Sequence, residues 1–275
     1  MRANPALQIL KFFFLVFGAL LIVFPMYVTV SLALKTTEES TKSLLGFPSH
    51  VYLGNFKKVL STGKFTIFLS NSVLITVVSL IVMMIIIPMA SFAISRNQKS
   101  KMFSFFFYFI LFGIFVPFQV IMLPVLKHMS NLNLMNQLGL IIMYIALSIT
   151  QGVFLSVGFL KNVPMELDEA SRIDGCNIWD TFTRIIYPLM LPIIVTILIL
   201  NSLWIWNDFN LPLILLNKHS NYWTLPLFIY NFKSEYSFDY NLAFAGFFLT
   251  MIPIIILYSF MQRYIISGLT EGALK

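Results

Sequence analysis

Six long apolar stretches exclude a soluble fold for this sequence. A helix needs about 20 mostly apolar residues to cross a bilayer, because each backbone amide must be satisfied inside the helix. Only 11% of the 275 residues are charged, against about a quarter in soluble domains. The expected spans are residues 12–34, 67–94, 103–126, 138–160, 189–216 and 242–266. The sequence therefore predicts an all-α integral membrane protein with six transmembrane helices, folded as a single transmembrane domain over residues 1–275.

The first stretch also has features of a cleaved signal peptide. Arg2 and Lys11 supply positive charge before it, and Ser31–Ala33 offers small residues. Its apolar run is longer than the roughly 7–15 residues of a signal-peptide core, which favours a retained span. Prolines within the expected spans predict kinks, at Pro25, Pro88, Pro117 and Pro253.

The basic residues favour one orientation in the membrane without fixing it. The net charge is +7, but no basic cluster interleaved with aromatics indicates nucleic acid. With the N-terminus inside, ten of the 18 basic residues fall in cytoplasmic segments and eight in outer ones. Arg96, Lys99 and Lys101 crowd between the second and third spans, which favours this orientation by the positive-inside rule. The long segment 35–64 between the first two spans is then an outer loop or a short interfacial helix.

Several kinds of chemistry are not expected of this chain. Cys176 is the single cysteine, so no disulfide forms within the chain. The histidines His50, His128 and His219 lie in separate loops, which argues against a metal site. No phosphate-binding G-x-x-x-x-G-K-[ST] motif occurs, so the chain is not expected to hydrolyse ATP.

The charged segment 161–187 predicts two short helices joined by a turn. Pro164 suits the first turn of a helix, and the acids that follow it favour the positive end of the helix dipole. Asp174-Gly175 predicts a helix stop, and Asn177 predicts the cap of a second helix with Asp180 three residues later. The acids are Glu166, Asp168 and Glu169, and the expected apolar face of the second helix is Ile178, Phe182, Ile185 and Ile186.

The acidic residues of this segment favour a protein partner. A helix pair that lies on lipid would be the alternative. The acids outnumber the local bases, and anionic headgroups would repel them.

The same segment resembles the EAA loop of ABC importer permeases. The family pattern is E-A-A, three residues, G, nine residues, I, one residue, L-P. Here Glu169, Ala170 and Ser171 are followed by Gly175, and Ile185 precedes Tyr187-Pro188 at the same spacing. Ser171 replaces the second alanine of the pattern, and Tyr187 replaces leucine.

Other segments resemble the carbohydrate-uptake, MalG-type branch of these permeases. The resemblance covers about 200 residues in the right order. Its segments are Asn71-Ser72, Ala93–Arg96, Pro117–Gln119 with Pro124, Trp206–Phe209 with Pro212-Leu213, Thr224–Pro226, and the tail Gln262–Tyr264 with Gly268–Lys275.

The resemblance implies a type I ABC importer permease fold in the cytoplasmic membrane, with both termini cytoplasmic. The loop would dock on a separate ATPase dimer that binds ATP and Mg, while this non-catalytic chain binds no cofactor. The implied partners are a second permease, an extracytoplasmic solute-binding protein and membrane lipid. The implied ATPase contacts are Glu169, Ala170, Ser171, Asp174, Gly175, Ile185 and Pro188 in the loop, and Gly268, Thr270 and Gly272 in the tail.

Polar residues within the fifth expected span allow two interpretations. Asp208 is an acid at membrane depth, which is by default a functional candidate. With Asn201, Trp204 and Asn207 it would form a wall that binds sugar, since aromatic faces stack on sugar rings and amides bind hydroxyls. The alternative is a structural polar cluster near Pro212.

Aromatic residues crowd the outer segment 217–241 and also allow two interpretations. They form an interfacial belt, or, by the resemblance, reach toward the solute-binding protein. They are Tyr222, Trp223, Tyr230, Tyr236 and Tyr240.

Import of a sugar or oligosaccharide is the predicted function. Glycerol phosphate or another polyol is the alternative within the same machinery. A self-sufficient secondary carrier would need ion-coupling residues at membrane depth, where only Asp208 is evident, and an intramembrane enzyme would need a catalytic cluster that the sequence lacks.

Overall fold

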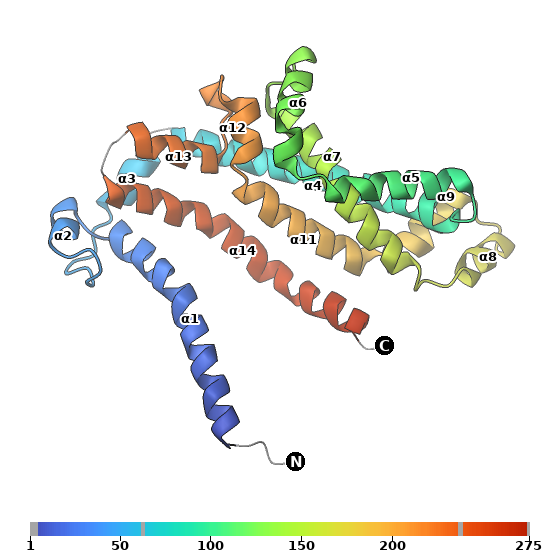
Figure 1. Ribbon diagram of the computed structural model, residues 1–275, viewed down its shortest axis with the longest axis horizontal. Helices are drawn as coiled ribbons and strands as arrows, with labels where there is room; N and C mark the ends of the chain where they lie inside the picture. Colours follow the sequence, from blue (N-terminus) through green and yellow to red (C-terminus); the bar gives the residue numbers. More distant parts are fainter. Residues whose placement is uncertain (1–4, 62–63, 236–238, 274–275) are drawn as a thin grey trace. The chain divides into compact units, whose positions relative to one another are not determined.

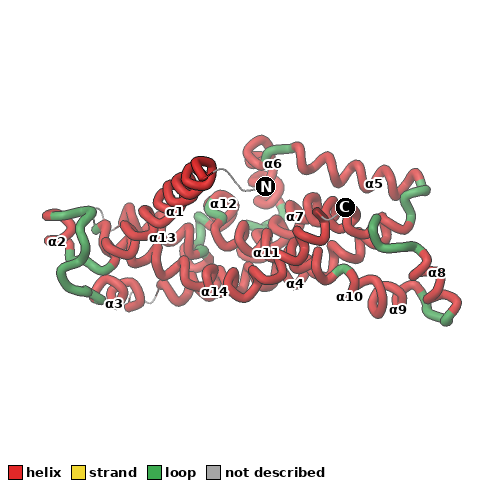
Figure 2. Tube along the Cα trace, turned by 90° about the horizontal axis from the view of Figure 1, so that it is seen from below, coloured by secondary structure: helices red, strands yellow, loops and turns green. Residues whose placement is uncertain are grey.

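The computed structural model describes the backbone of residues 5–61, 64–235 and 239–273, and side chains within residues 8–61, 64–230 and 239–260. Every regular element in these ranges is a helix (Figure 2). Four helices are long and apolar enough to cross a membrane. They are α1 (Pro5–Ala33), α4 (Lys64–Arg96), α7 (Gln137–Leu160) and α14 (Tyr240–Ala273).

Two further spans are possible as bent pairs of helices. The first joins α5 (Lys101–Phe112) and the short 3-10 helix Gly113–Phe115 to α6 (Phe118–Asn131) through a bend of 106° (Figure 1). The second joins the helical stretch Ile178–Leu189 to α11 (Leu191–Asn207) through a bend of 69°. The described part therefore holds four spans, or six if each bent pair crosses once.

The third and fifth expected spans are interrupted, and the interruption of the third lies at Pro117, where a kink was predicted. The third breaks before α6, where Pro117 has extended backbone (ψ 136°) and has no N–H to donate. The fifth breaks at Asp208, which is also extended (ψ 131°), and α12 (Asn210–Leu216) follows as a separate helix.

The chain divides into two compact units, residues 68–227 with 254–275 and residues 1–67 with 228–253. In the unit built on residues 68–227, the buried core comes mainly from α4, α7, α11 and α12, with Met129 of α6 and Leu227 at the end of the range. Gly152 of α7 permits close packing, because a Cβ there would lie 2.6 Å from Ile87 of α4. Tyr144, fully buried on α7, is the largest side chain of this core.

The same unit includes part of the outer segment 217–241, which is partly helical. A 3-10 turn (Ser220–Tyr222) leads into α13 (Leu225–Glu235). Asn71, within α4, donates through Nδ2 to the carbonyls of Asn221 (2.8 Å) and Trp223 (3.0 Å). The neighbouring Ser72 hydroxyl accepts from the backbone N–H of Leu225 (2.9 Å). These two side chains therefore fix the start of α13, a role that satisfies an otherwise unpaired helix donor.

In the unit that contains α1, amide side chains donate hydrogen bonds to the last carbonyls of that helix. Asn241 Nδ2 donates to the Leu32 carbonyl (2.7 Å), and Asn55 Nδ2 donates to the Ala33 carbonyl (2.9 Å). Lys35 is fully buried, and its Nζ donates to the carbonyls of Ser43 (2.9 Å) and Gly46. The segment that was expected to be a loop or a short interfacial helix, residues 35–64, contains two short helices, α2 (Thr37–Lys42) and α3 (Gly54–Ser61).

Candidate functional site

The charged segment after α7 forms a helix, a glycine turn and a second helix, as its residues predict. The first helix is α8 (Glu166–Ile173), and Pro164 lies two residues before it rather than in its first turn. All three predicted acids do occupy that first turn. Two neighbouring acids there differ in environment: Asp168 is only 9% exposed, whereas Glu169 is exposed.

Asp168 forms a buried ion pair that joins this segment to α4. Arg96, the last residue of α4, places Nε 2.7 Å from Oδ2 of Asp168, and its Nη2 donates to Oδ1 at 3.2 Å. Arg96 Nη1 also donates to the Val163 carbonyl at 3.2 Å. Both charged side chains are about nine-tenths buried (10% and 12% exposed). The pair thus combines one charge-assisted hydrogen bond with a second close charge contact, which holds α8 against the end of α4.

Ser171 makes a second internal contact. Its hydroxyl donates to the Asp168 carbonyl (2.8 Å) and shares a hydrogen bond with the Thr181 hydroxyl (2.8 Å), and Ser171 is 2% exposed. The serine that replaces alanine in the family pattern therefore ties the first helix of the segment to the second.

Gly175 ends α8 in a closed turn. Its φ is +81°, the left-handed region that favours glycine. The N–H of Cys176 donates to the Ser171 carbonyl (2.9 Å), and the N–H of Gly175 donates to the Arg172 carbonyl (3.1 Å). These two bonds define a Schellman motif, and they confirm the stop predicted from Asp174-Gly175.

The second helix begins where its cap was predicted. Asn177 Oδ1 accepts from the Asp180 N–H (2.9 Å). The helix runs through α9 (Ile178–Asp180), a π-helical turn (Thr181–Ile186) and α10 (Tyr187–Leu189). The π turn alters the α-helical register, so the predicted apolar face is wrong at its start: Phe182 and Ile186 are buried, but Ile178 is 69% exposed.

The buried side of this second helix packs on the membrane helices. Ile186 and Met190 are fully buried and cluster with Leu160 of α7. The rings of Phe182 and Phe92 lie 5.3 Å apart, which adds a contact with α4. Tyr187 is half-buried and donates to the Met84 carbonyl at 3.4 Å. The loop is therefore attached to α4 and α7 by both charge and apolar packing.

The exposed surface of the loop 161–187 combines acids with large apolar side chains. At helical spacing, Glu166, Glu169 and Ile173 share the face of α8 opposite Asp168 and Ser171. Ile173 is 86% exposed, and Trp179 beyond the turn is 59% exposed. The carboxylates of Glu166 and Glu169 make no ion pair or hydrogen bond within the described residues. Large exposed apolar side chains near unpaired charges are typical of interaction surfaces.

Asp208, the acid of the fifth expected span, has partners from two elements. Its Oδ2 accepts from the Tyr144 hydroxyl (3.0 Å) and from the Leu211 N–H (3.3 Å), and its Oδ1 accepts from the Asn210 N–H (3.0 Å). Asp208 therefore caps α12 at the break and ties it to α7. This geometry matches the structural interpretation of the acid.

The other three candidates near Asp208 do not share one environment. Asn201 is buried, accepts from the Ser148 hydroxyl (2.6 Å) and donates to the Ile197 carbonyl (2.9 Å). Trp204 is 40% exposed and meets Tyr144 edge-on at 5.4 Å. Asn207 is exposed and donates to the Leu203 carbonyl of its own helix (2.8 Å).

Asn201 and Trp204 line one cavity of about 500 Å³, whereas Asn207 and Asp208 do not. The α5–α6 bend contributes Gly113, Ile114, Val116 and Phe118 to this cavity, and α7 contributes Leu147, Ser148, Thr150, Gln151, Phe154 and Leu155.

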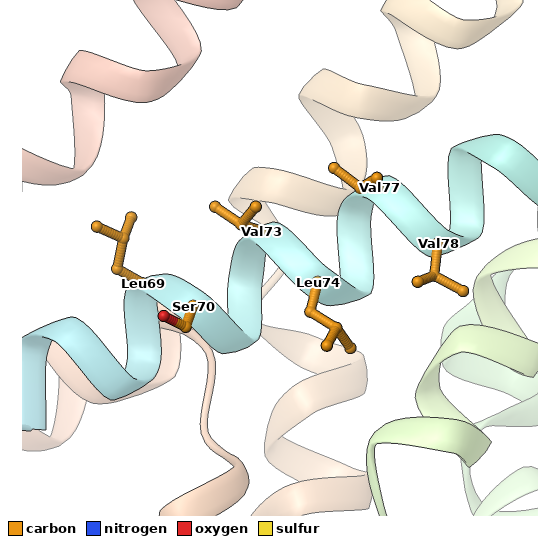
Figure 3. A pocket seen from close by; sticks show the side chains of 6 residues that line it. All are labelled: Leu69, Ser70, Val73, Leu74, Val77 and Val78. Carbon is orange, nitrogen blue, oxygen red and sulfur yellow. The ribbon is translucent and has the colours of Figure 1, made fainter.

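A second space, of about 510 Å³, lies along one side of α4 and has a different chemistry. Figure 3 shows its six side chains in a row on that helix: Leu69, Ser70, Val73, Leu74, Val77 and Val78. With five aliphatic groups and the Ser70 hydroxyl as its single polar group, this face suits lipid or an apolar helix better than a polar solute.

The tail candidates Gly268, Thr270 and Gly272 fall in the last turns of α14, and their side chains lie outside the described residues. Tyr236 of the outer segment also lies outside them. Of the other outer aromatics, Tyr230 and Tyr240 are 60% and 53% exposed.

Known proteins resemble this chain over nearly its full length. It is 44% identical over 267 residues to the multiple sugar-binding transport system permease protein MsmG of Streptococcus mutans, with 96% of each chain covered. It is 33% identical over 257 residues to the probable starch degradation products transport system permease protein AmyC of Thermoanaerobacterium thermosulfurigenes, covering 94% of this chain and 93% of that protein.

A solved structure shares the fold. A chain of a bacterial ABC transporter involved in the import of the acidic polysaccharide alginate matches with a TM-score of 0.81, covering 96% of this chain and 98% of that one at 21% identity. This likeness identifies the type I ABC importer permease fold.

The family model named binding-protein-dependent transport system inner membrane component matches residues 86–271. The matched range includes the charged loop, the cavity beside α7 and α14 as far as residue 271. The chain belongs to the family of binding-protein-dependent transport system inner membrane components, the permease subunits of ABC importers.

Proposed function

We propose that this chain imports a sugar or oligosaccharide as one permease subunit of an ABC importer, and that a separate ATPase drives it through the loop 161–187. The observation that carries the proposal is the division of the loop into two sides. One side is attached to α4 and α7. The other presents acids that have no partner in the described part of the chain, together with exposed apolar groups.

The attached side supports a mechanical role. A lever must be rigid and firmly attached to what it moves. The Arg96–Asp168 ion pair and the Ser171–Thr181 hydrogen bond meet both conditions. A displacement of α8 would therefore be transmitted to the end of α4 without deformation of the loop.

The outward side supports a protein partner. Glu169 would pair with a basic residue of the ATPase, and Ile173 and Trp179 would fill apolar recesses of its surface. Ala170 and Asp174 are exposed near this face. Among the other positions predicted to contact the ATPase, Ser171 is buried and would support the lever from within, and Gly175 would form its turn. Ile185 is half-buried and Pro188 is exposed near the start of α11.

The remaining partners follow from the same assembly. A second permease would complete the path, two ATPase subunits would bind ATP and Mg, and an extracytoplasmic solute-binding protein would deliver the ligand. The tail around Gly268, Thr270 and Gly272 would add an ATPase contact. Because a loop that meets an ATPase is cytoplasmic, both termini would be cytoplasmic in a multi-pass protein of the cytoplasmic membrane.

A carbohydrate is the best-supported substrate. The names of the two similar permeases refer to multiple sugars and to starch degradation products. A polyol such as glycerol phosphate would use the same machinery, but neither of these names refers to one. The chain itself would be non-catalytic and would bind no cofactor.

Reconstitution tests the proposal. The chain is incorporated into vesicles with its second permease, ATPase and binding protein, and uptake of labelled maltotriose, sucrose and lactose is measured with and without ATP. We expect ATP-dependent accumulation of at least one of these sugars only when all the partners are present. Uptake by the purified chain alone would contradict the proposal and favour a secondary carrier.

A further inference from the structure

Two polar groups that line the cavity beside α7, the Gln151 amide and the Trp204 indole N–H, make no hydrogen bond within the described residues. Gln151 is exposed on α7, and its amide makes no hydrogen bond within the described residues. It lies nine residues from the nearer end of a 24-residue helix, which is about 14 Å at the helical rise. Gln151 is therefore near the middle of the span.

An unpaired amide at this depth requires a polar neighbour. Hydrocarbon cannot satisfy it, and polar groups exposed to lipid at the bilayer centre are disfavoured. Water, a polar solute or a polar group of the second permease must therefore reach Gln151, which sets this cavity apart from the aliphatic side of α4 in Figure 3.

The hydroxyl and amide side chains that line the cavity beside Gln151 are held in place by hydrogen bonds within the chain. Ser148 donates to Asn201, which also donates to the backbone of its own helix. Thr150 donates to the Leu147 carbonyl at 2.9 Å. These side chains hold their positions by internal bonds, so a ligand would meet a preformed surface, which lowers the entropic cost of binding.

Aromatic surface lies beside the free amide. Trp204 is fixed by its edge-on contact with Tyr144 but remains 40% exposed, and its indole N–H makes no hydrogen bond within the described residues. Phe118 and Phe154 also line the cavity. A flat apolar surface next to a hydrogen-bonding amide suits a sugar ring, whose faces are apolar and whose edge carries hydroxyls.

We infer that the cavity lined by Gln151, Trp204, Phe118 and Asn201 is a sugar-binding subsite of this subunit, used during transport. The inference rests on the proposed function and assigns roles within it. The Gln151 amide binds a ring hydroxyl, Trp204 stacks on the ring, and the Ser148–Asn201 pair supports both. The volume of about 500 Å³ lies within the roughly 300–1,000 Å³ of small-molecule sites.

A first experiment measures whether a solute reaches Gln151. The only cysteine, Cys176, is replaced by serine, and Gln151→Cys is introduced into the complete reconstituted transporter. Gln137→Cys, on the first turn of the same helix, is the matched control. We expect a charged methanethiosulfonate reagent to modify the Gln151→Cys thiol, and the sugar that wild-type vesicles import to slow this reaction by several fold. Slowing should be absent from the control.

A second experiment measures transport. Gln151→Leu should lower the efficiency of sugar uptake by about tenfold, the effect of one hydrogen bond, while ATPase stimulation by the binding protein persists. Trp204→Ala should lower uptake similarly, and Trp204→Phe should retain most of it. Gln137→Leu should behave as the wild type.

Failure of the proposed importer function and failure of the proposed sugar-binding subsite would give different results. If wild-type vesicles import none of the sugars in the presence of ATP, the proposed function is wrong. If the wild type imports sugar but Gln151→Leu behaves like Gln137→Leu, or if the Gln151→Cys thiol is inaccessible or unprotected, the subsite is refuted and the importer function stands.

Discussion

The charged loop 161–187 and the cavity beside α7 use polar side chains by the same division of roles. In the loop, Asp168 is buried against Arg96, and the adjacent Glu169 is exposed without a partner in the described part of the chain. In the cavity, Asn201 is buried against Ser148, and Gln151 is exposed without a partner there. In each region, the paired residue fixes the backbone and the unpaired one is free to meet another molecule.

The two regions differ in the kind of molecule that their unpaired residue would bind. The loop surrounds its free acid with protruding groups, such as Ile173 at 86% exposure, and a convex surface suits a protein groove. The cavity surrounds its free amide with a concave aromatic lining, which suits a small solute. A residue's partners within the chain therefore separate structural from recognition roles better than its chemical type does.

The largest effect should come from reversing the free acid of the loop. Glu169→Lys is expected to lower ATP-driven uptake by roughly 100-fold or more, because a charge that pairs across an interface would become repulsive. Membrane insertion should be normal. Glu38→Lys, which reverses an exposed acid in the first turn of α2, is the control and should transport normally. Equal uptake by the two variants would remove the distinction between Glu169 and an ordinary surface acid.

Breaking the paired acid should act on stability as well as on coupling. Arg96→Asp or Asp168→Arg alone leaves like charges in a nearly buried site, at a cost of about 3–5 kcal/mol. We expect a lower thermal midpoint and little sugar-stimulated ATPase activity from either variant. The exchange of both charges should recover part of each property, and no recovery would show that the ion pair does not attach the loop to α4.

Gly175→Val should produce a smaller loss. Valine has open space at this position, but φ of +81° disfavours it, and such strain costs about 1–3 kcal/mol. The turn should distort and reduce coupling, seen as ATP hydrolysis without proportional uptake. Gly158→Val is the control, because Gly158 also has open space and has no positive φ. A normal ratio of sugar to ATP in Gly175→Val would contradict the role of the turn.

The smallest effect should follow removal of the buried pair in the cavity. Asn201→Leu leaves the Ser148 hydroxyl without its acceptor, at a cost of about 1–3 kcal/mol. Adding Ser148→Ala should return most of the lost thermal stability, because no buried group then stays unpaired. If the double variant is as unstable as the single one, the hydrogen bond is not the source of the loss.

The local chemistry of the loop was predictable from sequence. Asp174-Gly175 and Asn177 act through backbone atoms within a few residues, and the structure has both the turn and the cap. The Arg96–Asp168 pair was missed, because its members lie 72 positions apart and each had a simpler local explanation. The π turn was also missed, because the apolar spacing had been interpreted with an α-helical period.

The cavity was only partly predictable. Asn201 and Trp204 stood out because the fifth expected span is rich in polar and aromatic residues. Gln151 did not, although a lone amide in the middle of an otherwise apolar span was the available signal. Which of these residues share one cavity depends on the bend between α5 and α6, and Pro117 predicted a kink there but not its angle of 106°.

Cross-linking from the loop tests the central claim most directly. In the Cys176→Ser background, Ile173→Cys places a thiol on the exposed face of α8, and Glu38→Cys places one on α2 as a control. A short thiol-to-lysine cross-linker is added to the assembled transporter in native membranes. We predict that the ATPase is joined to Ile173→Cys, that addition of ATP changes the yield, and that Glu38→Cys does not react with it. Assembled transporter in which Ile173→Cys never captures the ATPase would contradict the account.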